Sequence, residues 1–319
     1  MFNCLRLFFV LCLSFSLHAD TFNKKVAYIA SDMSIPFWQI LSRGIQNASQ
    51  KTNYSLTIYN AQNDAKQELE SVIAAIKNQV DAIIISPTTS VACVTVLNLA
   101  KEAKIPVIIA DVGTDDGEYL SYISSNNKQG AYDIAQILIQ KMQERNFMQG
   151  TVGIIAIPQK RLNGQARTQG FMQALKEANI SGADIKQQVN FSLEETYLLA
   201  KELIQNNKNL KAIWLQGSDK YEGALQAIEE AGKKEEILLI TFDAEPIFLE
   251  LIPQGVLVGA AMQQPFLMGE KAIEVLDAYF KEEAVTQNIQ LPILAISQDN
   301  IDSQLYIIQR NVLGLEETR

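Results

Sequence analysis

A β-strand and a helix follow each other directly in residues 26–51, which read VAYIASDMSIPFWQILSRGIQNASQK. The first five residues are apolar, as in a parallel strand that is covered on both faces. Apolar side chains then recur at helical spacing from Phe37 to Ala48, and Pro36 stands where the first turn of a helix tolerates proline. This order of elements is the repeating unit of a doubly wound parallel sheet.

The same unit recurs along the chain in two series. Helical patterns separate short apolar runs that predict strands, at residues 26–30, 55–59, 82–86 and 106–111 in the first series and at 152–157, 185–191, 212–216 and 237–242 in the second. A helical pattern at 268–279 and an apolar run at 291–296 close the second series. We therefore expect an α/β fold with two similar lobes and a cleft between them. No linker rich in Gly, Ser or Pro separates the two series, so the chain is expected to cross between the lobes more than once.

The composition is that of a globular protein with an acidic surface. The 319 residues are 48% hydrophobic, and 36 acidic residues against 27 basic ones give a net charge of −9. Such a charge repels phosphate backbones and anionic lipid, which argues against nucleic-acid binding. The chain has one histidine. That shortage argues against most catalytic mechanisms.

Residues 1–19 have the pattern of a secretory signal peptide. Arg6 gives the positive start, Leu7–Leu17 form the apolar stretch, and cleavage is expected near Ala19. The processed chain would contain no histidine and a single cysteine, Cys93, so that no intrachain disulfide could form. We therefore expect an exported, soluble protein.

Motifs for nucleotides, acyl hydrolysis and metals are absent from the sequence. The first strand–helix turn has no G-x-G-x-x-G, and no P-loop, G-x-S-x-G or metal-spaced Cys/His cluster occurs. Residues 115–118 and 218–221 do not supply a calcium loop. The sequence therefore predicts no cofactor and no metal.

Six segments lie where the strands of such lobes end or where the lobes are linked. They are SDMSIPFW at 31–38, IIAD at 108–111, ISSNN at 123–127, RTQGF at 167–171, ITFD at 240–243 and AMQQP at 261–265. In their order and spacing they resemble the ribose/galactose-type periplasmic sugar-binding proteins, whose core the LacI-type repressors share. The resemblance covers essentially the whole processed chain. It implies the type I periplasmic binding protein fold, with two Rossmann-like lobes joined by three crossover strands.

The resemblance also implies lobe boundaries and a role. The crossovers would fall near residues 125–126, 263–264 and 292, giving one lobe of residues 20–126 plus 264–292 and another of 127–263 plus 293–319. The implied role is that of a monomeric periplasmic receptor, which closes on a sugar or sugar-like ligand and delivers it to the membrane permease of an ABC importer. An alternative is a sensor that presents a sugar or a furanone-type signal to a histidine kinase or a chemoreceptor. A glycoside hydrolase that uses Asp111 and Asp243 as its carboxylate pair is a weaker alternative.

Eight residues match the ligand contacts of that family. The aromatic positions are Phe37, Trp38 and Phe191, and the polar ones are Asp111, Asn127, Arg167, Asp243 and Gln263. These residue types suit a sugar, because an aromatic ring covers its C–H face while carboxylate and guanidinium groups bond its hydroxyls. Each type also has a simpler explanation. The aromatic residues could belong to the core, the two aspartates could cap turns, and Arg167 could form a surface ion pair.

Three polar contacts of the ribose receptor are missing or replaced in this chain. Val112 stands in place of an arginine, Gly217 and Ser218 in place of asparagine and aspartate, and Ile35 in place of another asparagine. A pocket with fewer donors suits a ligand other than ribose, such as a different pentose, a polyol, a deoxy sugar or a furanone. Candidates for replacement contacts are Asp32, Ser34, Gln216 and Ser218.

Overall fold

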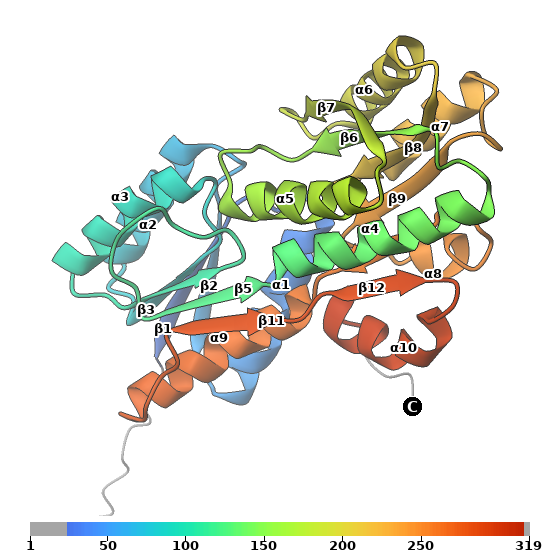
Figure 1. Cartoon of the computed structure of the whole chain (residues 1–319). Coiled ribbons are helices and arrows are strands. Elements are labelled where there is room, and N and C mark those ends of the chain that lie inside the picture. The colour runs from blue at the N-terminus through green and yellow to red at the C-terminus, as the bar shows by residue number, and fades with distance from the viewer. Residues whose placement is uncertain (1–23, 316–319) are drawn as a thin grey trace, which may run out of the picture.

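Two six-stranded sheets form the framework of the protein in the computed structural model, which describes residues 24–315 (Figure 1). The strand order is β11-β5-β4-β3-β1-β2 in the first sheet and β12-β10-β9-β8-β6-β7 in the second. Apolar clusters on both faces of each sheet pack against helices. The predicted α/β fold with two lobes is therefore confirmed. The predicted signal peptide lies outside the described residues.

The first lobe combines the beginning of the described chain with a later segment. Its elements are β1 (Lys25–Ala30), α1 (Pro36–Lys51), β2 (Ser55–Asn60), α2 (Ala65–Lys77), β3 (Ala82–Ile85), α3 (Ser90–Glu102), β4 (Val107–Ala110), β5 (Ser121–Ser125), α9 (Pro265–Phe280) and β11 (Asn288–Leu291). All six strands of its sheet run parallel. Every residue of β3 and β4 is buried, and each buried isoleucine there contributes about 1.5–3 kcal/mol of stability.

The second lobe repeats this plan. Its elements are α4 (Asn127–Glu144), β6 (Thr151–Ala156), α5 (Leu162–Glu177), β7 (Ser181–Gln187), α6 (Leu193–Asn206), β8 (Leu210–Leu215), α7 (Tyr221–Glu230), β9 (Leu238–Phe242), α8 (Phe248–Leu251), β10 (Gly259–Met262), β12 (Leu294–Ser297), α10 (Ile301–Ile307) and a π-helical turn, η1 (Ile308–Val312). The sheet is parallel except for β12, which runs antiparallel to β10.

The chain passes between the lobes three times, at neighbouring places. It crosses from β5 to α4, from β10 to α9 and from β11 to β12. The N–H of Asn126 donates to the carbonyl of Leu291 at 2.9 Å, and the side chain of Gln264 donates to the carbonyl of Pro292 at 2.8 Å. These bonds hold the three crossings together. The opposite edges of the sheets, β2 and β7, lie away from them.

In each lobe, two helices pack closely against each other. Helix α1 packs on α9, and α4 packs on α5 (Figure 1). A Cβ atom at Gly44 of α1 would overlap the carbonyl oxygen of Phe266, and one at Gly170 of α5 would overlap the carbonyl oxygen of Lys128. Glycine is needed at both positions because any side chain would push the helix backbones apart.

Several strand predictions were wrong in detail. The strand expected at residues 185–191 is β7, which ends at Gln187, and the run at 291–296 is two strands in different lobes, separated by Pro292. The apolar runs did not predict β5 and β10, although the resemblance placed crossovers at their ends. Their sequences, SYISS and GAAM, are too rich in small and polar residues to look like buried strands.

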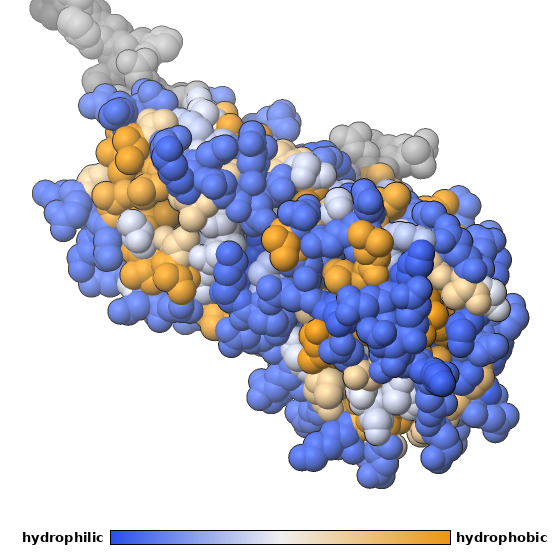
Figure 2. Space-filling model, turned by 90° about the horizontal axis from the view of Figure 1, so that it is seen from above, coloured by the Kyte–Doolittle hydropathy of each residue, from blue (hydrophilic) through white to orange (hydrophobic). Residues whose placement is uncertain are grey.

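No helix within residues 24–315 is both long and apolar enough to cross a bilayer. Hydrophilic residues dominate the face seen in Figure 2, and the hydrophobic residues there lie in separate patches. Scattered apolar residues of this kind are normal on folded proteins.

Candidate functional site

A cavity between the lobes collects residues from the carboxyl ends of strands in both sheets. Of the eight predicted ligand contacts, seven line this cavity: Phe37, Trp38, Asp111, Arg167, Phe191, Asp243 and Gln263. They come from segments more than 200 residues apart, because Phe37 follows β1 and Gln263 follows β10. Parallel strands place their carboxyl ends at one edge of a sheet, and the two edges face each other here.

Asp111 and Asp243 occupy equivalent places in the two lobes. Each directly follows the fourth strand of its series, β4 or β9. The N–H of Asp111 donates to the carbonyl of Ile123, and that of Asp243 to the carbonyl of Ala261, both at 2.9 Å. Both residues have left-handed backbone, with φ of 70° and 67°. Aspartate tolerates this conformation better than most residues, and it turns each carboxylate out of the sheet edge into the cavity.

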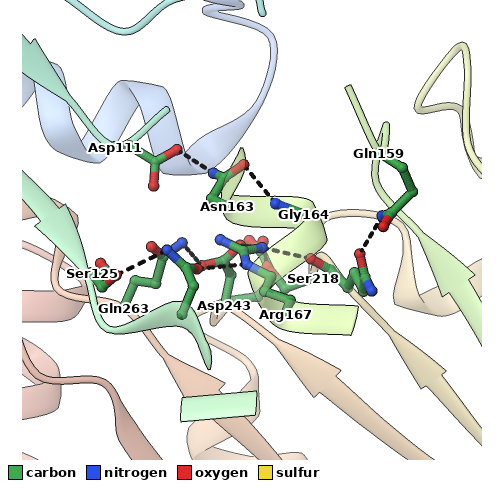
Figure 3. Close-up of polar contacts among 12 residues, drawn as sticks. Asp111, Ser125, Gln159, Asn163, Gly164, Arg167, Ser218, Asp243 and Gln263 are labelled. Atoms are coloured by element: carbon green, nitrogen blue, oxygen red, sulfur yellow. Dashed lines mark hydrogen bonds and ion pairs between the residues drawn. The ribbon is translucent and has the colours of Figure 1, made fainter. Parts of the chain in front are cut away.

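The Asp111 carboxylate is only half satisfied by the protein. It is 2% exposed, and its Oδ2 accepts a hydrogen bond from the Asn163 side chain at 3.0 Å, across the lobes (Figure 3). Its Oδ1 is buried without a protein partner. Burial raises the pKa of Asp111 to about 6, although the charge of Arg167 opposes the shift. An acceptor oxygen is thus left facing the cavity.

Arg167 is the centre of the polar network on the second lobe (Figure 3). It is 2% exposed, and its guanidinium lies 3.8 Å from the centre of the Phe242 ring. Nη1 donates to the carbonyl of Gln216 at 2.7 Å and lies 3.4 Å from Oδ2 of Asp243. A surface ion pair, the simpler explanation for this arginine, is therefore excluded.

Asn127, the eighth predicted contact, is placed differently from the others. It does not line the cavity. Its Oδ1 accepts a hydrogen bond from Nε of Arg167 at 2.8 Å, and its Nδ2 donates to the carbonyl of Ser125 at 3.0 Å. The structure therefore gives Asn127 the geometry of a residue that orients Arg167.

Gln263 continues this network from the end of β10. Its Nε2 donates to Oδ1 of Asp243 at 2.6 Å, while its Oε1 is buried without a protein partner. Burial raises the pKa of Asp243, and Arg167 counteracts the shift. Asp243 is thus held by Arg167 and Gln263, and Gln263 offers a second free acceptor.

Three aromatic rings complete the lining. Phe37 and Trp38 meet edge to face, with ring centres 4.8 Å apart, and Trp38 is 3% exposed. Trp38 also packs in the first-lobe core, so this one side chain both belongs to the core and lines the cavity. Phe191 lies in the turn between β7 and α6 and not at the end of a strand as predicted, with its ring 5.8 Å from the guanidinium of Arg161.

Five lining residues escaped the sequence prediction, namely Ile157, Arg161, Asn163, Asp219 and Glu245. Arg161 and Asn163 flank the start of α5, and both line the cavity. The signal that could have found them is topological, because this turn follows β6 at the carboxyl edge of its sheet. Arg161 gives the cavity a second guanidinium, although Val112 stands where the ribose receptor has an arginine. Val112 is fully buried, in the first-lobe core.

Three of the four altered positions line the cavity. Ile35, Gly217 and Ser218 line it together with Asp219 and Glu245. Ser218 donates its hydroxyl to Oε1 of Glu245 at 2.8 Å, and a Cβ atom at Gly217 would have no neighbour closer than 3.8 Å. The lining therefore includes two further carboxylates, and Gly217 leaves open space beside it.

Of the four residues suggested as replacement contacts, only Ser218 lines the cavity. Asp32 and Ser34 bond each other in the turn after β1, and the side chain of Gln216 bonds Gln159 and Thr168. Across residues 24–315, no cluster of His, Cys, Asp or Glu side chains could hold a metal ion.

Comparisons with known proteins agree with this architecture. A family model described as a periplasmic binding protein domain matches residues 26–284. The ribose import binding protein of Haemophilus influenzae is 26% identical over 86% of this chain and 91% of its own length. The D-apiose import binding protein of Actinobacillus succinogenes is 24% identical over 83% of this chain and 86% of its own length.

Solved structures show the same fold. A carbohydrate transporter solute-binding protein from Agrobacterium radiobacter, in complex with D-arabinose, superimposes with a TM-score of 0.84 at 22% identity, covering 92% of this chain and 99% of that one. A galactofuranose-binding protein superimposes with a TM-score of 0.81 at 22% identity, covering 91% and 99%. On the extent of the family match and on its two-lobed fold, the chain belongs to the periplasmic binding protein family.

Proposed function

We propose that this chain is a periplasmic solute-binding protein that closes on one small neutral sugar or polyol and delivers it to an ABC importer. The observation that supports this best is the pair of free acceptors, Oδ1 of Asp111 and Oε1 of Gln263, which are buried on opposite sides of one cavity. A buried acceptor without a partner costs about 1–3 kcal/mol. A hydroxyl-rich ligand would donate to both and remove that cost.

The charges of the cavity favour a neutral ligand over an anionic one. Four carboxylates line it, from Asp111, Asp219, Asp243 and Glu245. Two guanidinium groups line it, and each is partly engaged by protein acceptors, through Nε and Nη2 of Arg161 and through Nε and Nη1 of Arg167. A sugar acid or sugar phosphate would therefore meet four carboxylates and only two guanidinium groups.

The size of the cavity favours a single ring. The volume of the cavity is about 50 Å³. A single water molecule needs roughly 10–15 Å³ of such volume. The cavity therefore has room for about four waters, which is far too little for an oligosaccharide. Ile35 and Gly217 supply no polar side-chain atoms to the lining, which supports a ligand other than ribose.

The proposed role is binding without chemical change. Arg167 and Gln263 both bond the Asp243 carboxylate and so fix its position. A fixed carboxylate suits a group that orients a bound ligand. The relatives named above are import and solute-binding proteins. Turnover of chromogenic glycosides that is lost in Asp243→Asn would contradict the proposal.

The proposed location and partners follow the family. The chain would be exported, be cleaved near Ala19, act as a monomer in the periplasm and dock on a membrane permease. Deleting its gene should then lower cellular uptake of the sugar that it binds.

A thermal-shift screen over pentoses, hexoses, polyols and furanones, with sugar acids as the anionic comparison, would test the proposal. Because a ligand that binds only the folded protein stabilises it, at least one neutral compound should raise Tm in proportion to the logarithm of its concentration. Stabilisation by sugar acids alone would reject a neutral ligand. Stabilisation by no compound in the set would reject the sugar and polyol class.

The two tryptophans provide a second readout. Trp38 lines the cavity, while Trp214 is stacked on Phe171 in the second-lobe core, with ring centres 3.9 Å apart. A ligand in the cavity should change the fluorescence of the Trp214→Phe variant and leave that of Trp38→Phe nearly unchanged. The opposite pattern would place the ligand elsewhere.

A further inference from the structure

Arg161 of the second lobe reaches across the cleft to the first lobe. It directly precedes α5 and is 4% exposed. Its Nε donates to the carbonyl of Thr88 at 3.1 Å, and its Nη2 donates to Oγ of Ser31 at 3.3 Å and to Oδ1 of Asn63 at 2.8 Å. All three acceptors belong to loops of the first lobe.

The two residues after Arg161 also bridge the lobes. The N–H of Leu162 donates to Oγ of Ser90 at 3.2 Å, and Asn163 donates to Asp111 at 3.0 Å. Three consecutive residues thus place five hydrogen bonds between the lobes. They form one cluster at the start of α5.

This cluster lies away from the connections between the lobes. Ser31, Asn63 and Thr88 follow β1, β2 and β3. In the first sheet, β1 and β2 lie at the edge opposite to β5 and β11, where the chain crosses between the lobes. Arg161 therefore links the two lobes on the side of the cleft away from the crossings, where the lobes would separate on opening.

The charge of Arg161 is balanced by the opposite lobe. Its acidic neighbours, Asp111, Glu68 and Asp32, all belong to the first lobe, while its nearest cation, Arg167, belongs to its own lobe. Burial lowers the pKa of Arg161, and the first-lobe carboxylates oppose this shift. The buried guanidinium therefore has its compensating charges only when the lobes are together.

Glu68 supports the first-lobe side of this contact. It is 1% exposed, and its Oε2 accepts a hydrogen bond from the N–H of Thr88 at 2.5 Å. The carbonyl of the same residue, Thr88, accepts from Arg161. The Thr88 backbone is thus held between a carboxylate of its own lobe and an arginine of the other.

We propose that Arg161 is a clasp that stabilises the closed arrangement of the lobes before any ligand binds. The inference goes beyond the proposed sugar binding, and it assigns Arg161 a positioning role. Apparent affinity rises with the fraction of molecules in the binding-competent state, so the clasp would also set how tightly any ligand is held.

The competing role for Arg161 is that of a ligand contact only, since it also lines the cavity. The two roles differ in the absence of ligand. A clasp changes the distance between the lobes of the free protein, whereas a mere ligand contact does not. The test therefore measures lobe distance without ligand, and its result does not depend on whether a sugar is ever found to bind.

Spin labels on the two lobes give that distance. Val91 of α3 and Val189 after β7 are 63% and 66% exposed. Each would be replaced by cysteine in a background in which Cys4, Cys12 and Cys93 are alanine, because these are the three cysteines of the sequence. Double electron–electron resonance would then be recorded on the labelled full-length chain and its variants. Thermal unfolding of each variant would confirm that it is folded.

In Arg161→Gln the ratio of short to long label distances should fall by about tenfold, because several charge-assisted hydrogen bonds are lost. Arg161→Lys should give an intermediate ratio, since one ammonium group cannot reach all three acceptors with the same geometry. Asn63→Gly removes an acceptor from the opposite lobe and tolerates the backbone φ of 56° at that position, so it should shift the ratio in the same direction.

Arg145→Gln is the matched control. It removes the same charge from the same lobe, but Arg145 is exposed and bonds Glu235 within that lobe. Its distances should equal those of the labelled parent. If Arg161→Gln and Asn63→Gly also leave the parent's distance distribution unchanged, whether that distribution is short or long, Arg161 is not a clasp.

Discussion

At the scale of single residues, the candidate site consists largely of carboxylates and aromatic rings that follow the ends of strands. Asp111 and Asp243 could be predicted because strands that end in Asp are visible in the sequence and sheet topology brings those ends together. Arg161 and Asn163 could not be singled out in the same way. Nothing in the residues around them shows that the start of α5 faces the other lobe, since that depends on how the two lobes meet.

The Trp38 side chain offers a direct test at this scale. Trp38→Ala should weaken ligand binding by about 2–4 kcal/mol, because a buried aromatic anchor is lost. Titration calorimetry with the ligand found in the screen would measure the change. Since Trp38 also packs in the first-lobe core, circular dichroism must show that the variant is folded. Trp214→Phe is the control, and an unchanged affinity in Trp38→Ala would contradict the stacking role.

Asn127 gives a second residue-scale prediction. Asn127→Ala should weaken binding of the same ligand by about 1–3 kcal/mol, because Nε of Arg167 loses its acceptor and the guanidinium its fixed orientation. Asn126→Ala, at the adjacent cap of α4, is the comparison. Equal affinity of Asn127→Ala and the parent would show that Arg167 is oriented by its remaining bonds.

At the scale of elements, the uniformly apolar strands were predictable, whereas the bounds of β7 and the small-residue or polar strands β5 and β10 were not. The four-residue strands β3 and β4 are uniformly apolar and fully buried, so their pattern is unambiguous. Strand β7 lies at a sheet edge and is mostly exposed, and its sequence SGADIKQ carries no apolar run that would fix its ends. Phe191 was for that reason assigned to a strand that ends four residues earlier.

The packing of α1 on α9 can be tested by adding one methyl group. Gly44→Ala should lower the free energy of unfolding by about 1–3 kcal/mol, because the new Cβ would overlap the backbone of Phe266. Urea denaturation would measure it. Gly182→Ala is the matched control, since a Cβ there would meet only the end of the Met172 side chain at 3.5 Å. Equal stability of Gly44→Ala and the parent would mean that the helices can separate without cost.

At the scale of the whole molecule, buried carboxylates make stability depend on pH. Burial raises the pKa of Glu68 to about 7, from an ordinary value of 4.5. The folded protein therefore holds this proton more tightly than the unfolded chain does. The contribution to stability is present in full below about pH 4.5 and is lost as the pH rises through 7. Asp111, with its pKa raised to about 6, acts in the same direction.

Urea denaturation at pH 5 and pH 8 would check this expectation. The free energy of unfolding should be higher at pH 5 by this contribution, and Glu68→Gln should reduce the difference between the two values. Glu235→Gln, at an exposed site, should leave the difference as it is in the parent. If Glu68→Gln leaves the difference between pH 5 and pH 8 unchanged, the pKa of Glu68 is the same in the folded protein and in the unfolded chain.

The return of α9 and β11 to the first lobe has a consequence for biosynthesis. The first sheet lacks an edge strand until residue 291 has been made, and the second lacks one until residue 297. A nascent chain that stops at residue 263 would hold two incomplete sheets, with no helix to cover the apolar side of α1. Neither lobe can therefore reach its final form before nearly the whole chain is present, although most of each is encoded in one uninterrupted stretch.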